Sequence, residues 1–218
     1  MSFYIIGIAI WGQKAIQKVH FISRLWARFI FFWCGIWLKT TGQAPNPKQP
    51  MVLISNHLSA LDIPVCAIAT RNPFKFLAKA ELGKIPVLGW IISNIYITVN
   101  RSSPAARKQS LAAMKKAIDD GTSVFIYPEG TRNTSSDPLR RFHEGAFKLA
   151  IDAQVPVGIL HIQGTNRICP PKGFSLNPGR LKAHWVAIKP TTGLKPEDSE
   201  KLMEQCQEEL LNSIKEMQ

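Results

Sequence analysis

The chain has 218 residues, 45% of them hydrophobic, and is therefore long enough to bury the core of one domain. Its net charge of +12 at pH 7 indicates an anionic partner such as nucleic acid, a phospholipid surface or a phosphorylated substrate. The four cysteines form no C-x-x-C motif and no disulfide-framework spacing, which argues against a disulfide-rich fold and favours reduced thiols in a cytosol-facing protein.

The first forty residues are unusually apolar. Residues 1–13 and 29–38 carry no charge, but as helices they would reach only about 20 Å and 15 Å, against roughly 30 Å of bilayer hydrocarbon. On a helical wheel the segment between them has a polar side with Gln13, Lys14, Gln17, Lys18, His20, Arg24 and Arg28. The other side carries Ile16, Val19, Ile22, Trp26 and Ile30, with Phe21 and Leu25 as exceptions.

This pattern is typical of helices that lie in a membrane interface. We therefore expect residues 1–40 to form membrane-associating helices and residues 41–218 to form a separate domain. The attachment would be to one leaflet on the cytoplasmic face, which is the inner membrane in a bacterium. A signal peptide fits poorly, because no basic region precedes the first apolar run. A core helix of a soluble domain is the alternative interpretation.

Short apolar runs rich in β-branched and aromatic residues alternate with helical patterns after the linker at 40–50. The expected strands are 51–55, 74–78, 95–99, 122–127, 155–162 and 183–188. The expected helices include 104–120, where Ser103 can cap and Gly121 can end the helix, and 197–217. The alternation predicts an α/β fold, a single domain with a central mixed sheet flanked by helices.

Two polar segments follow expected strands. In "NHLSALD" (56–62), five helical steps would place His57 and Asp62 on different faces, so they can meet only if His57 precedes the helix that carries Asp62. Either Ser59 or Asp62 can cap that helix. A carboxylate bonded to one imidazole nitrogen supports proton removal by the other, so His57 is a candidate general base oriented by Asp62. A satisfied histidine beside a capping aspartate is the alternative.

The second segment, "FIYPEGTRN" (125–133), places Glu129, Gly130, Thr131 and Arg132 at a strand exit, where open α/β sheets bind ligands. Arg132 can hold a phosphate or carboxylate through two hydrogen bonds, Gly130 permits close backbone approach, and Glu129 can brace a cation or a hydroxyl. A polar turn without function is the alternative for this segment taken alone.

These segments resemble the glycerolipid acyltransferases of the 1-acyl-sn-glycerol-3-phosphate acyltransferase type. "NHLSALD" and "YPEGTR" match two of the family's motifs completely. "ITVNR" (97–101) resembles another, a strand closed by Arg101, although Ile95 stands where a glycine is usual. "VPVGILHI" (155–162) matches the fourth in part, because Pro156 is present while a second proline is missing near Ile159.

The resemblance implies transfer of an acyl group from acyl-CoA or an acyl carrier protein to the free hydroxyl of lysophosphatidic acid, giving phosphatidic acid. It implies His57 as the base, Asp62 as its orienting acid, and Arg101 and Arg132 as phosphate ligands. Glu129 and Gly130 would shape the acceptor pocket, and Thr131 would contribute to the structure of this segment. Lys79 is a further candidate for phosphate contact, or a solvated surface lysine. The segment "IPVLGWII" (85–92) would border the acyl chains or simply pack in the core.

The expected partners are a phospholipid membrane, a lysophospholipid acceptor and the thioester donor as co-substrate, with no other cofactor. Acylation of a different lysolipid, or a noncatalytic basic protein of the membrane surface, are the alternatives. No basic run interleaved with aromatics suggests nucleic-acid binding. We expect no metal, because His20, His143, His161 and His184 show no ligand spacing.

Overall fold

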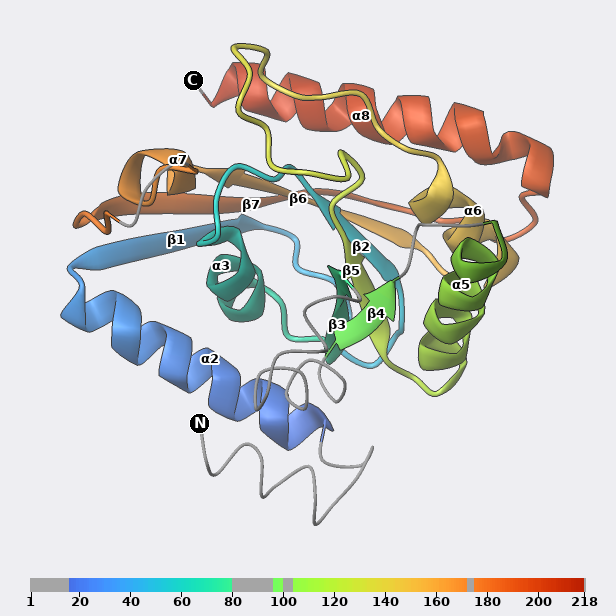
Figure 1. Ribbon diagram of the computed structural model, residues 1–218, viewed down its shortest axis with the longest axis horizontal. Helices are drawn as coiled ribbons and strands as arrows, with labels where there is room; N and C mark the ends of the chain where they lie inside the picture. The colour runs from blue at the N-terminus through green and yellow to red at the C-terminus, as the bar shows by residue number, and fades with distance from the viewer. Residues whose placement is uncertain (1–15, 80–95, 100–103, 172–174, 218) are drawn as a thin grey trace.

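The structure is a computed structural model that describes residues 16–79, 96–99, 104–171 and 175–217 (Figure 1). Its strands are β1 (Ile36–Gly42), β2 (Val52–Ser55), β3 (Phe74–Lys79), β4 (Tyr96–Val99), β5 (Ser123–Ile126), β6 (Val157–Gln163) and β7 (Gly179–Lys189). Its helices are α2 (Ile16–Trp33), α3 (Asp62–Ala69), α5 (Pro104–Asp119), α6 (Gly145–Asp152), α7 (Thr165–Ile168), the 3-10 turn η3 (Pro196–Asp198) and α8 (Ser199–Glu216).

The described strands form one mixed sheet in the order β1-β7-β6-β2-β5-β3-β4. The five strands from β6 to β4 run parallel, whereas β7 is antiparallel to β6 and carries β1 parallel to itself at the edge. The predicted mixed α/β sheet is therefore confirmed, as are all six expected strands and the helices at 104–120 and 197–217 within a few residues.

Helices cover both faces of the sheet, because alternate residues of the central strands point to opposite sides. Val52 and Ile54 of β2 pack in a core with α5, α6 and α8. Met51 and Leu53 pack on the other side, in a core that includes residues of α2 and α3. Figure 1 shows α8 on one side of the sheet and α2 with α3 on the other. The sheet thus lies between two helical layers.

The expectation that helices extend through residue 40 is wrong. Helix α2 ends at Trp33, and Ile36–Gly42 forms the edge strand β1, so the expected boundary at residue 40 falls inside a strand. Burial alternates over residues 36–39 as in a strand with one covered face, since Ile36 is buried and Trp37 is exposed. An uncharged run of this length reads equally well as helix or strand, and pairing with β7 decides for the strand.

Helix α2 docks onto the domain with part of its polar side. Nε2 of the buried His20 lies 2.5 Å from the backbone carbonyl oxygen and 3.0 Å from the backbone nitrogen of Phe74, and the Arg24 guanidinium reaches the Thr70 carbonyl at 3.5 Å. The outward-facing side combines parts of both sides of the wheel, which the wheel by itself does not reveal. Ala27 and Phe31 are buried against the domain. The exposed large side chains of the helix are Phe21, Ile22, Leu25, Trp26, Phe29, Phe32 and Trp33.

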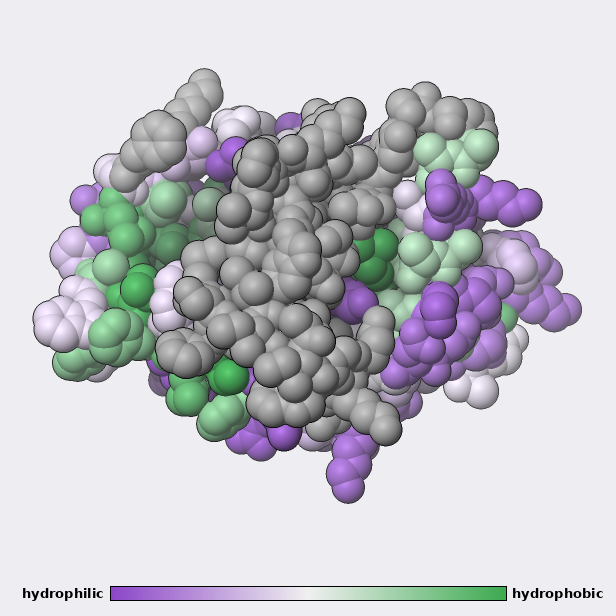
Figure 2. Space-filling model, turned by 60° about the horizontal axis from the view of Figure 1, so that its bottom comes forward, coloured by the Kyte–Doolittle hydropathy of each residue, from purple (hydrophilic) through white to green (hydrophobic). Residues whose placement is uncertain are grey.

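Figure 2 shows one face of the molecule, with hydrophobic side chains gathered over α2 at one end and hydrophilic ones over α5 at the other. Trp37 of β1 extends the exposed apolar side chains beyond the helix end. None of the described helices combines the length and the apolar composition that crossing a bilayer requires. The predicted apolar segments 1–13 and 85–92 lie outside the described residues.

Candidate active site

The candidate site lies at the edge of the sheet where the parallel strands end. His57 follows β2, Glu129 follows β5 and Thr165 follows β6, and these three strands are neighbours in the order β6-β2-β5. Because the carboxyl ends of parallel strands meet at one edge, the loops that carry these residues converge there. The two sequence motifs, separated by more than sixty residues, are thereby brought together.

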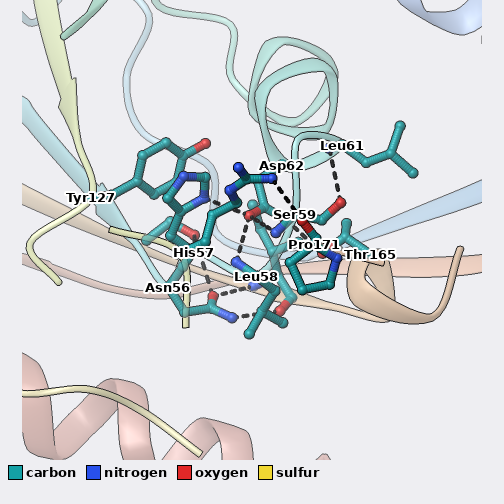
Figure 3. Close-up of polar contacts among 12 residues, drawn as sticks. Asn56, His57, Leu58, Ser59, Leu61, Asp62, Tyr127, Thr165 and Pro171 are labelled. Atoms are coloured by element: carbon teal, nitrogen blue, oxygen red, sulfur yellow. Dashed lines mark hydrogen bonds and ion pairs between the residues drawn. The ribbon is translucent and has the colours of Figure 1, made fainter. Parts of the chain in front are cut away.

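His57 and Asp62 form the predicted pair. Asp62 is the first residue of α3, and His57 lies in the loop before that helix, as the spacing requires. The His57 Nδ1 atom is 2.8 Å from Asp62 Oδ2 (Figure 3), and the carboxylate is fully buried. The same oxygen accepts the backbone N–H groups of Leu58 at 2.7 Å and Ser59 at 2.8 Å. The carboxylate therefore holds both the loop and the imidazole.

The structure has neither of the two predicted caps of α3, in which Ser59 or Asp62 would be the N-cap residue. Leu61 is the N-cap of α3, and it has no side-chain cap bond. Asp62 does fold back onto the Ser59 N–H, as a capping box requires, but the Ser59 hydroxyl instead donates to the Cys169 carbonyl at 2.6 Å. The Ser59 hydroxyl also accepts the Leu61 N–H at 3.2 Å. The serine thus ties the loop to the end of α7.

The His57 ring is stacked on Tyr127, with centroids 4.0 Å apart and planes inclined by 12° (Figure 3). Aromatic contact on one face and the Asp62 bond on one edge leave few other orientations for the ring. The other ring nitrogen, Nε2, makes no hydrogen bond to any described residue, and the His57 side chain is 17% exposed. The imidazole therefore presents a nitrogen that can take a proton from an incoming group.

Glu129 braces the loop that carries His57. Its carboxylate accepts the backbone N–H of His57 at 2.7 Å and that of Arg140 at 3.0 Å, and its side chain is buried. Burial raises the pKa of this carboxyl, and the two N–H bonds act in the opposite direction. Asn133 adds a second tie, because its N–H donates to the His57 carbonyl at 2.7 Å. The partners of both backbone groups of His57 thus come from the loop that begins with "PEGTR".

Asn56 anchors the same loop to the sheet. Its side-chain amide donates to the Ile162 carbonyl at 2.8 Å, and its Oδ1 accepts the Ile162 N–H at 2.9 Å. This pair of bonds copies the pairing that a neighbouring strand residue would make, although the asparagine lies past the end of β2. Asparagine at this position thus fixes where the chain turns toward His57.

The remaining predicted residues are placed unevenly. Gly130 has a φ of +74°, a conformation that glycine adopts at little cost, and it ends a turn closed by its N–H to the Tyr127 carbonyl. Thr131 and Arg132 are exposed, and the Arg132 guanidinium reaches the Pro171 carbonyl at 3.5 Å. Lys79 is the last residue of β3, which ends at the same edge. Arg101 lies outside the described residues.

Three contacts of the site had no signal in the sequence pattern. Tyr127 stacks on His57, Asn56 pairs with β6, and the Thr165 hydroxyl donates to Asp62 Oδ1 at 2.6 Å. Asn56 and Tyr127 lie inside the two quoted segments, whereas Thr165 is 103 residues from Asp62. In the part of the chain that the structure describes, no three histidine, cysteine or acidic side chains are grouped so that they could hold a metal ion.

Comparison with known proteins agrees with this geometry. The family model described as Acyltransferase matches residues 38–159, which is more than half of the chain. The alpha 1-acyl-sn-glycerol-3-phosphate acyltransferase of Ovis aries is 30% identical over 200 residues, covering 90% of this chain and 69% of that protein. The chain belongs to the acyltransferase family. The matched range of this family member contains both halves of the site, and the resemblance predicted from the motifs is confirmed.

Further relatives of this acyltransferase-family chain are longer than it is. A chloroplastic 1-acyl-sn-glycerol-3-phosphate acyltransferase of Arabidopsis thaliana is 32% identical over 179 residues, 81% of this chain and 49% of that protein. The chain thus spans about half the length of the plant relatives it matches. The 1-acyl-sn-glycerophosphate (LPA) acyltransferase PlsC from Thermotoga maritima has the same fold, with a TM-score of 0.81 over 99% of this chain and 88% of that one, at 22% identity.

Proposed function

We propose that this protein transfers a fatty acyl group from a thioester to the free hydroxyl of lysophosphatidic acid, giving phosphatidic acid. The observation that carries the proposal is the His57 imidazole, held by Asp62 at Nδ1 and free at Nε2 among the described residues. An imidazole held in this way is suited to act as a general base. Relatives named 1-acyl-sn-glycerol-3-phosphate acyltransferases support the acceptor.

In the proposed reaction, the acceptor hydroxyl gives its proton to His57 Nε2 as its oxygen attacks the carbonyl carbon of the thioester. The buried Asp62 carboxylate stabilises the imidazolium that forms and keeps the ring in place. When the tetrahedral intermediate collapses, the C–S bond breaks and the ester carbonyl forms. The leaving sulfur takes the proton back from His57, which restores the starting state without a covalent enzyme intermediate.

Arg132 is the proposed ligand of the acceptor phosphate among the described residues. It is exposed, and it follows the turn that Glu129 and Asn133 tie to His57. A planar guanidinium fits phosphate oxygens through paired hydrogen bonds. Arg101 and Lys79 are proposed as further phosphate contacts, because Lys79 ends β3 and Arg101 follows β4 in the chain, and these two parallel strands end at the same edge. The donor is acyl-CoA or an acylated carrier protein.

The exposed apolar face of α2 is the proposed membrane-binding surface. Phe29, Phe32 and Trp33 are more than half exposed, which is unusual for a water-facing helix. Lys18 and Arg28 on the same helix are exposed and suited to an anionic lipid surface. A protein that draws a lysophospholipid from a membrane and returns phosphatidic acid to it gains from such an attachment, at the cytoplasmic face.

Activity is tested with the full chain, lysophosphatidic acid and both donor types, with products read by mass spectrometry. Replacing His57 by Gln should lower the rate about 10²- to 10⁴-fold while the protein stays folded. His184→Gln is the matched control, since His184 is bonded to Thr41 in the sheet and should keep the wild-type rate. A wild-type rate in the His57 variant would contradict the role of His57 as the general base. Product from other lysolipids, and none from lysophosphatidic acid, would favour the alternative acceptor.

Membrane attachment is tested by surface substitutions, because deleting residues 1–40 would also remove most of β1 from the sheet. The variant with Phe29, Phe32 and Trp33 replaced by Ser should lose most of its sedimentation with anionic vesicles. Leu111→Ser on α5, an exposed apolar site away from α2, is the control and should sediment normally. Unchanged sedimentation of the triple variant would contradict this surface as the attachment site.

A further inference from the structure

The two oxygens of the Asp62 carboxylate are held by different parts of the chain. Oδ2 accepts three hydrogen bonds, from His57 Nδ1 and from the backbone N–H groups of Leu58 and Ser59, all within five positions of Asp62 in the chain. Oδ1 accepts one, from the Thr165 hydroxyl at 2.6 Å, and no other described residue donates to it. The local loop thus satisfies one oxygen, and a segment 103 residues away satisfies the other.

This distant bond determines the orientation of the carboxylate. With Oδ2 alone anchored, the group could turn about its Cβ–Cγ bond and change the direction in which it faces His57 Nδ1. A second anchor on Oδ1 fixes the plane of the group. Asp62 and Thr165 are both fully buried, so loss of the hydroxyl would leave a charged oxygen without its donor in the protein interior.

The backbone places Thr165 for this contact. Gly164 has a φ of +93°, and a Cβ there would lie 3.1 Å from the Arg180 carbonyl oxygen, so the chain turns sharply after β6 only with glycine. Thr165 then begins α7, and its carbonyl accepts the Cys169 N–H at 2.8 Å. The Cys169 carbonyl in turn accepts the Ser59 hydroxyl. One end of α7 is therefore bonded to Asp62 at the start of α3, and the other end to Ser59 in the loop that carries His57.

We propose that Thr165 is a positioning residue for the reaction, acting through Asp62 on the orientation of His57. The inference rests on the proposed function for its kinetic part. The hydroxyl keeps its proton throughout, and Thr165 contacts neither the acceptor nor the donor. The site is then a chain of three side chains: Thr165 at the start of α7, Asp62 at the start of α3, and His57 in the loop between β2 and α3.

The kinetic test is Thr165→Val, which keeps the shape of the side chain and removes the hydroxyl. We expect kcat to fall about 10- to 100-fold, as for a small misplacement of a reacting group, with KM for both substrates within about twofold. Thr165→Ser restores the donor and should return kcat to within about threefold of wild type. A kcat of Thr165→Val equal to that of wild type would overturn the proposal, as would a serine variant as slow as the valine variant.

Thr191→Val is the matched control. Thr191 is also buried, and its hydroxyl donates to the Val155 carbonyl at 2.8 Å, away from Asp62. Each of the two valine variants loses one buried hydroxyl, and thermal melting measures the loss of stability that this causes in both. Only Thr165→Val should slow the reaction. If both variants slow it equally, Thr165 has a structural role alone and the proposal fails. If valine at 165 prevents folding, Thr165→Ala takes its place with the same expectation.

A second readout needs no substrate. The proton on His57 Nδ1 gives an NMR resonance that is assigned by its absence in His57→Gln protein. It should shift in Thr165→Val, return in Thr165→Ser, and stay unchanged in Thr191→Val. An unmoved resonance in Thr165→Val would overturn the proposal. If the wild-type protein transfers no acyl group, the proposed function fails, whereas this measurement still decides whether Thr165 positions the pair.

Discussion

Replacing Glu129 by Gln tests whether this residue braces the His57 loop or contacts the acceptor. The carboxylate accepts N–H groups from His57 and Arg140, one on each oxygen. Glutamine keeps one acceptor but turns an NH2 group toward the other N–H, so a buried bond is lost and two donors face each other. A hydrogen bond to a charged group contributes about 1.5–3 kcal/mol, and a buried unsatisfied donor costs about 1–3 kcal/mol.

We therefore expect the variant to lose about 2–4 kcal/mol of unfolding free energy, which corresponds to a melting temperature lower by about 5–15 °C. Its kcat should fall because the backbone of His57 shifts, while KM for the acceptor stays the same. Calorimetry and steady-state kinetics measure the two effects. Glu144→Gln is the control, since Glu144 is half-exposed, pairs with Lys148 and accepts the Ser199 hydroxyl through an oxygen that glutamine retains. It should change stability by less than about 1 kcal/mol. A raised acceptor KM at unchanged melting temperature would refute the bracing role and favour substrate contact.

Three further predictions concern single residues. Tyr127→Phe should keep the stack on His57 and the activity, whereas Tyr127→Leu should lower kcat about 5- to 10-fold, as loss of an aromatic pair worth about 1 kcal/mol predicts; equal rates would contradict a role for the ring. Gly130→Ala and Gly121→Ala should each cost about 1–2 kcal/mol at their positive φ, in melting experiments, but only the first should slow the reaction. Burial lowers the pKa of His161 from 6.5 to about 4, so between these pH values the unfolded chain binds a proton that the folded one does not. The contribution of neutral His161 to the unfolding free energy should be full above about pH 6.5 and should fall by about 2–3 kcal/mol by pH 4.5, measured by urea unfolding. His161→Asn should remove this pH dependence.

The sequence predicted the parts of the site whose positions depend on neighbours in the chain. The five-residue spacing of His57 and Asp62 allows one arrangement, with the histidine ahead of the helix, and the structure has it. The order of motifs and strands also placed Glu129 at the same sheet edge. The bonds of Glu129 to the backbone of His57 and Arg140 were not predicted, because a carboxylate beside a turn can face either a substrate or a backbone, and the local sequence does not say which. The predicted part of Glu129 in the acceptor pocket stays a prediction.

The parts that the sequence did not predict depend on distant contacts. No local pattern indicates that Thr165 reaches Asp62, since that contact follows from how β6 and β2 are paired. A helical wheel sorts the residues of α2 by polarity but does not tell which of them meet the protein, and the docked side includes both His20, bonded to Phe74, and the apolar Phe31. β1 was overlooked because its partner, β7, lies far along the chain.

The pairing of β1 with β7 has a consequence for synthesis of the chain. Thr41 and His184, which face each other across these strands, are 143 residues apart, so ribosomes adding about 5–20 residues per second need about 7–30 s between them. During that interval the nascent strand β1 has no partner strand, and helix α2, with its exposed apolar side chains, has already emerged from the ribosome. A bilayer near the ribosome would therefore meet this helix before the sheet is complete, and capture by lipid would shield it from self-association while the rest is translated.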